Sequence, residues 1–383
     1  MSVPPLPRAG SGQFLKDYVQ GLTTVDLERL FTRDAPEAYR FFSRGIDVES
    51  LRTLPWYSRL YHHCRLFFLA FTLKLTPARR AIYGMSLLAT VIGLFELARG
   101  YRLLLFPHPV FAPGTFWMLT GFLLVNLLVL LEVADRLSLK NDLEIAREIQ
   151  QAMLPRGAYQ APGIDAFGIT RPANTVGGDF YDILPLPDGR VLLALGDVAG
   201  KGSPAALLMA LLLAMMRTLV DEGFEGAALV TRLNAQIARH APRSRFVTLF
   251  VAVLNPTTGE LVYVNAGQNP PLLRRASGIY ERLRSGGMAL GMFESATYTT
   301  GHTTLDLDDV VVMYSDGITE AESGAGEPFD EVGVQAIVDA RRWGSAKELG
   351  WQLFQAVEQY TEQRRLFDDL TVLVARRLPA LPV

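Results

Sequence analysis

Apolar positions in the first half of the chain fall into two long runs. Residues 81–98 and 115–134 are almost wholly apolar, and Glu96 and Glu132 are their only charged residues. A helix needs about 20 apolar residues to cross a bilayer, with a lower limit of about 17. The runs therefore predict a transmembrane hairpin over residues 81–134. A helical hairpin buried within a soluble sensor domain is the alternative interpretation.

Basic residues are distributed unevenly around this predicted hairpin. The connector between the two runs carries only Arg99 and Arg102. The flanks carry Arg59, Arg65, Lys74, Arg79 and Arg80 before the hairpin, and Arg136, Lys140 and Arg147 after it. Because positive residues favour the cytoplasmic side, we expect a multi-pass protein of the cell membrane whose N-terminus and C-terminal part both face the cytoplasm. Residues 1–80 form a predicted helical N-terminal region to which the sequence assigns no chemistry.

A charged segment with a regular apolar repeat follows the second run. Apolar residues recur there at spacings of three and four, at Leu139, Leu143, Ala146, Ile149 and Met153. This spacing predicts an amphipathic linker helix over residues 135–155, ended by Pro155. Two interpretations stay open. The helix packs on its own domain, or it pairs with a second copy as a coiled coil and makes the protein a homodimer.

The pattern changes to alternating strands and helices after residue 162. Strands are predicted at 191–195, 246–254, 261–265, 310–314 and 371–375, and helices at 203–220, 226–238, 332–340 and 345–363. The helix at 203–220 is nearly all apolar, but it is short for a membrane span and lies between acidic motifs. We therefore expect a helix that is buried on all sides.

Composition limits the number of domains and the classes of partner and metal site that the chain can have. The chain has 383 residues, enough for two or three domains. Its mean hydropathy of +0.19 is high for a fully soluble protein and agrees with a membrane portion. The net charge of −2 gives no basic excess, which argues against a nucleic-acid partner. The single cysteine, Cys64, excludes an intrachain disulfide and a cysteine-based metal site.

Four acidic motifs provide the candidate chemistry. They cover residues 177–182, 196–202, 314–317 and 368–371, and each falls at a predicted strand end or turn. Their aspartates are Asp179, Asp197, Asp316 and Asp368. Carboxylates held close together repel one another unless cations lie between them. Because hard oxygen ligands suit Mg²⁺ or Mn²⁺, the four motifs together predict a metal centre.

These motifs carry a resemblance to a known family. The stretches VGGDFYDILPLPDGRVLLALGDVAGKG, RFVTLFVAVLNPTTGELVYVNAGQNPPLL, LDDVVVMYSDGITEAESGAGEPFDE and DDLTVLV occur in the family's order. Over residues 163–376 the chain resembles the bacterial PPM-type (PP2C-like) serine/threonine phosphatases, in the branch of the sporulation and stress-response regulators. LEIAREIQQAMLP resembles the helix that introduces such domains. The resemblance implies an α+β fold, a sandwich of two antiparallel β-sheets flanked by helices.

The resemblance also implies an activity and a set of ligands. The activity is hydrolysis of phosphoserine or phosphothreonine on a protein by water that two divalent metal ions, Mn²⁺ or Mg²⁺, activate. Asp197 corresponds to the aspartate that bridges both ions beside the catalytic water, with the Val198 carbonyl as a neighbouring ligand. Asp316 and Asp368 correspond to further ligands. Asp179 corresponds to a ligand that binds directly or through water.

Other positions are secondary candidates. They are Asp369, Asp182 and Gly317 near the metals, and Lys201, Asn265 and Asn269 as contacts to phosphate or substrate. A role in shaping a turn is the alternative for each of them.

The chain departs from the family's pattern in four places. Asn174 stands where animal and plant members carry an arginine that clamps phosphate, and Ala199 stands where they carry a histidine acid. The proton donor to the leaving group is therefore unassigned. Gln268 replaces a common histidine and Asp330 a common glycine, and we expect both to tune substrate contact or a loop.

The partner follows from the resemblance alone. The implied substrate is a phosphorylated protein similar to an anti-anti-sigma factor. The alternative is a catalytically weak regulatory scaffold that binds the same partners. A nucleotide cyclase is a third class, but the sequence has no nucleotide-binding loop to support it.

Overall fold

The computed structural model describes residues 75–101, 113–155, 157–242, 244–340, 342–362 and 366–379, with Ser58, Arg65, Phe68 and Thr72. Almost all of the predicted helical region 1–80, and most of the connector at 99–114, lie outside the described residues. The chain divides into two units, residues 1–136 and 137–383.

Two long apolar helices make up most of the described part of the first unit, and the second of them continues past residue 136. They are α5 (Pro77–Tyr101) and α6 (Pro113–Met153), and both are long and apolar enough to cross a membrane. Small residues bring them close together, since a Cβ added at Gly121 would lie 3.0 Å from the Ser86 carbonyl oxygen. Arg79 joins them further with ion pairs to Glu132 (3.0 Å) and Asp135 (2.6 Å). The helix α6 contains both the second predicted span and nearly all of the predicted linker.

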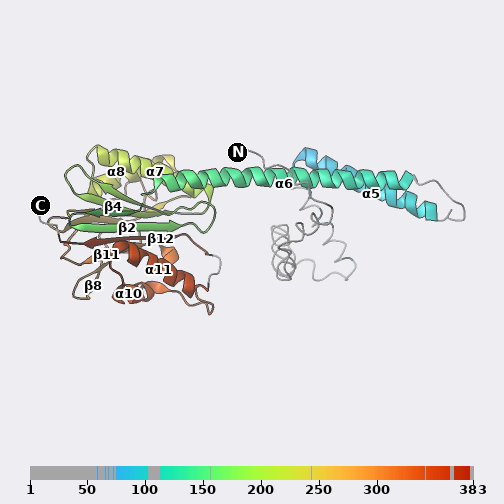
Figure 1. The fold of residues 1–383 in the computed structure, drawn as a ribbon. Coiled ribbons are helices and arrows are strands. Elements are labelled where there is room, and N and C mark those ends of the chain that lie inside the picture. Colours follow the sequence, from blue (N-terminus) through green and yellow to red (C-terminus); the bar gives the residue numbers. More distant parts are fainter. Residues whose placement is uncertain are drawn as a thin grey trace, which may run out of the picture. The chain divides into compact units, whose positions relative to one another are not determined.

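The second unit is a sandwich of two β-sheets (Figure 1). The first sheet has the order β1 (Ala158–Ala161), β2 (Ile164–Arg171), β12 (Leu370–Arg377), β11 (Val310–Tyr314), β7 (Leu272–Arg274) and β8 (Tyr280–Arg282). The second has the order β10 (Gly301–Thr304), β6 (Glu260–Ala266), β5 (Val247–Leu254), β4 (Val191–Val198) and β3 (Phe180–Pro185), and β9 (Gly286–Gly287) pairs with β6. All pairs are antiparallel except β6 with β9. The predicted α+β sandwich is confirmed.

Helices cover the outer faces of both sheets. They are α7 (Ser203–Asp221), α8 (Gly226–His240), the short α9 (Asp316–Thr319), α10 (Asp330–Asp339) and α11 (Ala346–Tyr360). Figure 1 shows α7 and α8 over the sheet that contains β4, and α10 and α11 over the sheet that contains β11 and β12. Because both faces of each sheet are covered, the central strands are almost continuously apolar and buried, as in the VLLALG run of β4.

The expectation that the helix at 203–220 is buried on all sides was wrong. One face of α7 packs into the core through Leu208, Met209 and Leu212. On the other face, Leu207 is 72% exposed and Leu211 is 49% exposed. A helix on the outside of a sandwich buries only the stripe that faces the sheet, so a wholly apolar sequence leaves an apolar stripe uncovered.

Candidate metal centre

The aspartates of the four motifs lie at ends of strands that pair with one another. Asp179 directly precedes β3, and Asp197 is the penultimate residue of β4, which pairs with β3 through Phe180 and Gly196. Asp316 follows β11, and Asp368 precedes β12, which pairs with β11 through Tyr314 and Val372. Antiparallel pairing brings the end of one strand beside the start of the next, so each pair of motifs meets at a strand end.

The two pairs of motifs lie beside one another, because the Gly178 amide donates a hydrogen bond to Asp369, the residue after Asp368. Burial, followed by the charges of Asp316 and Asp368, raises the pKa of Asp197 to about 7. Burial, followed by the charges of Asp197 and Asp369, raises the pKa of Asp179 well above its usual range. Burial and Asp368 also raise the pKa of Asp316. Carboxylates that oppose one another's ionisation in this way would be stabilised by a cation.

Asp179 and its neighbours offer oxygen atoms to such a cation. The Asp179 carboxyl is buried, and its Oδ2 atom has no hydrogen-bond partner among the residues that the structure describes. A Cβ added at Gly178 would lie 2.7 Å from the Val198 carbonyl oxygen and 3.0 Å from Asp197 Oδ1. The glycine therefore leaves both oxygens uncovered. An orphaned carboxylate oxygen beside further oxygen donors fits a hard divalent cation.

Within the described ranges, no three His, Cys, Asp or Glu side chains are arranged as a ready group around one ion. The candidate donors beside Gly178 are carboxylates together with the Val198 backbone carbonyl, so they do not form a group of this kind.

The structure places Asp369 as a support for the loop that carries Asp179. Its Oδ1 accepts a hydrogen bond from the Ala173 amide (2.7 Å), and its Oδ2 accepts one from the Gly178 amide (2.7 Å). A side chain at Gly177 would collide with the same carboxylate. Asp369 thus ties the loop before β3 to the start of β12.

Asp182 and Gly317 also serve local structure. Asp182 Oδ2 accepts a hydrogen bond from Arg217 Nε of α7 at 2.8 Å, and its Oδ1 accepts one from the Ile183 amide. A Cβ at Gly317 would collide with the Asp369 carbonyl oxygen, so glycine allows α9 to approach the start of β12.

The three candidate substrate contacts have different surroundings. Lys201 Nζ lies 2.8 Å from Asp368 Oδ2 and also donates to the Phe367 carbonyl. Asn265 is buried and holds its own turn, because its Oδ1 accepts from the Gln268 amide (2.8 Å) and its Nδ2 donates to the Gln268 carbonyl (3.0 Å). Asn269 Nδ2 lies 3.4 Å from Thr319 Oγ1 of α9.

Two departures from the family pattern have a structural role. Gln268 accepts a hydrogen bond from Thr248 Oγ1 (2.5 Å) and donates to the Tyr314 carbonyl (3.2 Å), which ties β5 to the strand end before Asp316. Asp330 has a φ of 57° at the start of α10. That backbone conformation favours glycine, so the aspartate keeps a turn that glycine would form more easily.

Sequence reasoning missed Gln150, which joins the linker helix to the metal-centre loop. Its Nε2 donates to the Gly177 carbonyl (2.8 Å), and its Oε1 accepts from the Gly177 amide (3.3 Å). Nearby, Arg217 Nη2 donates to the Met153 carbonyl at 2.7 Å. Gln150 lies four residues after Ala146 on the apolar stripe of α6. A buried polar residue on that stripe is the signal that could have identified it.

A cleft opens beside the cluster. It has a volume of about 820 Å³, and its walls include the 320–326 loop, Phe367, Asp368 and Gly317. Two of the predicted site residues therefore line a space large enough to admit part of a polypeptide.

A two-layered sandwich with aspartates at its strand ends defines a protein of the PP2C fold class. The PP2C domain of SiaA from Pseudomonas aeruginosa has this fold: it superposes with a TM-score of 0.55 at 19% identity, over 63% of this chain and 98% of that domain. The model of the stage II sporulation protein E (SpoIIE) family matches residues 187–378. The chain belongs to the SpoIIE family.

Two curated relatives share the same part of the chain. Phosphoserine phosphatase RsbU of Bacillus subtilis is 28% identical over 240 residues, which cover 62% of this chain and 71% of RsbU. Protein IcfG of Synechocystis is 27% identical over 280 residues, which cover 66% of this chain and 44% of IcfG. The chain thus spans less than half the length of IcfG.

Proposed function

We propose that this protein is a metal-dependent protein serine/threonine phosphatase tethered to the membrane by α5 and α6. The observation that carries the proposal is the buried aspartate cluster, in which Asp179 Oδ2 has no hydrogen-bond partner among the described residues. Membership of a family that includes a phosphoserine phosphatase directs this chemistry to phosphoserine or phosphothreonine on proteins.

The residues that would hold two Mn²⁺ or Mg²⁺ ions are Asp179, Asp197, Asp316, Asp368 and the Val198 carbonyl. When bound, the ions supply a water of lowered pKa and neutralise charge on the phosphoryl group. The chain supports these ligands through Asp369, which fixes the loop of Asp179, and through Gln268, which fixes the strand end before Asp316. Water adds to phosphorus while the bond from phosphorus to the serine or threonine oxygen breaks, and a proton from the water ends on that oxygen. Because water itself is the nucleophile, the reaction needs no covalent phosphoenzyme.

The substrate we propose is a phosphorylated protein similar to an anti-anti-sigma factor. The resemblance to stress-response regulators supports this class of partner. The cleft beside Asp368 supports a polypeptide substrate, because it extends from the cluster along the 320–326 loop and Phe367.

We also propose a homodimer formed through the linker part of α6. Gln150 on this helix faces its own domain, whereas Ile145 and Ile149 are about half exposed. Apolar residues four apart on the exposed side of a helix suit pairing with a second helix.

The test is release of phosphate from p-nitrophenyl phosphate and from a phosphoserine protein, with and without Mn²⁺. We expect Mn²⁺-dependent activity that falls roughly 100-fold or more in Asp197→Asn, the scale seen when one electrostatic contributor is removed. Asp188→Asn, on the exposed turn between β3 and β4, is the matched control and should keep its activity. A wild-type chain that binds its partner but releases no phosphate with either Mn²⁺ or Mg²⁺ would instead support the scaffold alternative.

A further inference from the structure

Lys201 lies on a short loop between the two halves of the candidate metal centre. The loop leaves β4 after Val198 and enters α7 at Ser203. Glycines flank the lysine on both sides, with φ of 104° at Gly200 and 76° at Gly202. The side chain is half exposed, and its ammonium reaches across to the residues before β12.

Both oxygens of the Asp368 carboxylate have partners. Lys201 Nζ lies 2.8 Å from Oδ2, and the Asp369 amide donates to Oδ1 at 2.9 Å. A cation that binds Oδ2 comes close to the ammonium already held there, and the two like charges repel one another. The amide belongs to the next residue of the backbone, whereas the lysine reaches Asp368 through a long flexible side chain. The lysine is the partner that can leave.

We propose that Lys201 is an internal counter-ion that holds Asp368 and releases it when the second metal ion binds. This inference rests on the proposed two-metal phosphatase. It implies that the ions bind in sequence. The first binds at Asp179, Asp197 and the Val198 carbonyl, and the second must compete with the ammonium for Asp368.

Release of Lys201 also affects the cleft. The ammonium donates to the Phe367 carbonyl, and Phe367 and Asp368 both line the cleft wall. The lysine thus ties the 199–202 loop to that wall. Binding of the second ion would cut this tie, so occupancy of the metal centre and the position of the wall are coupled.

The first test is calorimetric titration of the full-length protein with Mn²⁺. We expect two binding events in the wild type, the second weaker than the first. Lys201→Met keeps the length of the side chain and removes its charge, so it should tighten only the second event, by roughly threefold to tenfold given the modest strength of exposed ion pairs. Lys347→Met, on the exposed surface of α11, is the matched control. A second event of unchanged affinity in Lys201→Met would overturn the proposal.

A second readout separates displacement of the lysine from simple charge repulsion. The rate at which an amine-reactive acetylating reagent labels Lys201 is measured by mass spectrometry as Mn²⁺ is added. We expect labelling to accelerate across the second binding event, while Lys347 stays constant. Two bound ions with unchanged labelling of Lys201 would refute the counter-ion role and leave the phosphatase intact. A chain that binds no Mn²⁺ at all would refute the proposed function as well.

Discussion

Two aspartates of the sandwich are almost equally buried, but the charges around them have opposite signs. Asp309 is 1% exposed and Asp179 is 3% exposed. Asp309 directly precedes β11, whereas the candidate metal centre begins at the other end of that strand with Asp316. The two sites therefore show what a buried carboxylate requires at each end of the sandwich.

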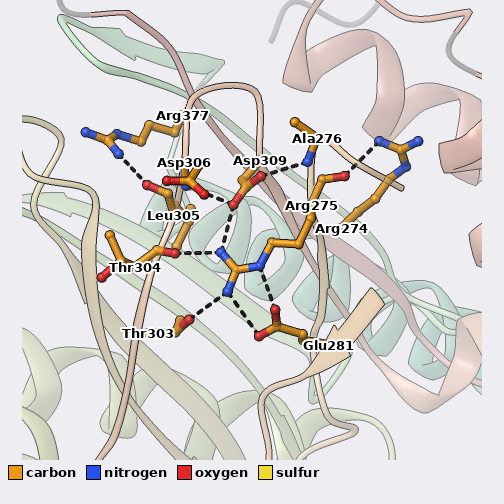
Figure 2. Close-up of polar contacts among 10 residues, drawn as sticks. All are labelled: Arg274, Arg275, Ala276, Glu281, Thr303, Thr304, Leu305, Asp306, Asp309 and Arg377. Carbon is orange, nitrogen blue, oxygen red and sulfur yellow. Dashed lines mark hydrogen bonds and ion pairs between the residues drawn. The ribbon is translucent and has the colours of Figure 1, made fainter. Parts of the chain in front are cut away.

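The charge of Asp309 is neutralised from within the chain (Figure 2). Its Oδ2 lies 2.8 Å from Arg275 Nη1 and accepts from the Asp306 amide at 2.8 Å, while its Oδ1 accepts from the Ala276 amide at 2.8 Å. Arg275 in turn pairs with Glu281 at 2.6 Å. Every member of this network has a partner, so the network is complete without a ligand.

Asp179 has carboxylates where Asp309 has an arginine. Its electrostatic neighbours are Asp197 and Asp369, and its Oδ2 has no partner among the described residues. A buried carboxylate that lacks an internal cation is unfavourable, and the protein retains it at a strand end beside a cleft. The source of the counter-charge, and not burial, therefore distinguishes a structural aspartate from a candidate ligand.

Substitution of Asp309 should have the largest effect on the stability of the sandwich. Asp309→Ala removes one of the two carboxylates that pair with Arg275 and also the acceptor of the Asp306 and Ala276 amides. Loss of the acceptor of a buried donor costs about 1–3 kcal/mol for each group. The denaturant midpoint of the sandwich should fall, and hydrogen exchange of the β11 amides should accelerate. Asp306→Ala, whose side chain is exposed, is the control and should change little. A small loss in Asp309→Ala would show that the network does not stabilise this end of the sheet.

A smaller effect is expected at the junction between α6 and the metal-centre loop. Gln150→Leu removes both hydrogen bonds to Gly177 and leaves two buried backbone groups unpaired, at a cost of about 1–3 kcal/mol. Hydrogen exchange at Gly177 and Gly178 should accelerate and Mn²⁺ affinity should weaken. Gln151→Leu, at the exposed neighbouring position, should do neither. Unchanged exchange in Gln150→Leu would contradict a positioning role for this glutamine.

The smallest effect we expect is a dependence of stability on pH. The pKa of Asp197 is raised to about 7 in the folded state. At pH values between the ordinary pKa of an aspartate and about 7, the folded state therefore binds more protons than the unfolded state. Stability of the metal-free protein should therefore decrease as pH rises through this window. The slope of the melting temperature against pH should be shallower in Asp197→Asn. Equal slopes would show that Asp197 is not held near other carboxylates.

Local sequence predicted the parts of the molecule that depend on short-range pattern. The apolar runs predicted α5 and α6, and acidic motifs at strand ends predicted where Asp179 and Asp316 would lie. Burial of α7 on all sides was a wrong prediction, because its composition does not show how many of its faces meet the sheet. The pairings of Gln150 with Gly177 and of Lys201 with Asp368 span 27 and 167 residues. A local pattern can mark one member of such a pair, but it does not identify the distant partner.

The most direct test of the proposed metal centre compares thermal unfolding of Asp179→Asn and Asp309→Asn, each in a chelator and in excess Mn²⁺. Asp179→Asn removes a charge that has no internal cation, so the melting temperature in chelator should rise and the gain on adding Mn²⁺ should disappear. Asp309→Asn should melt at a lower temperature in both conditions and keep its Mn²⁺ gain. If Asp179→Asn instead lowered the melting temperature in chelator, or kept the full Mn²⁺ gain, the cluster would not be a metal centre.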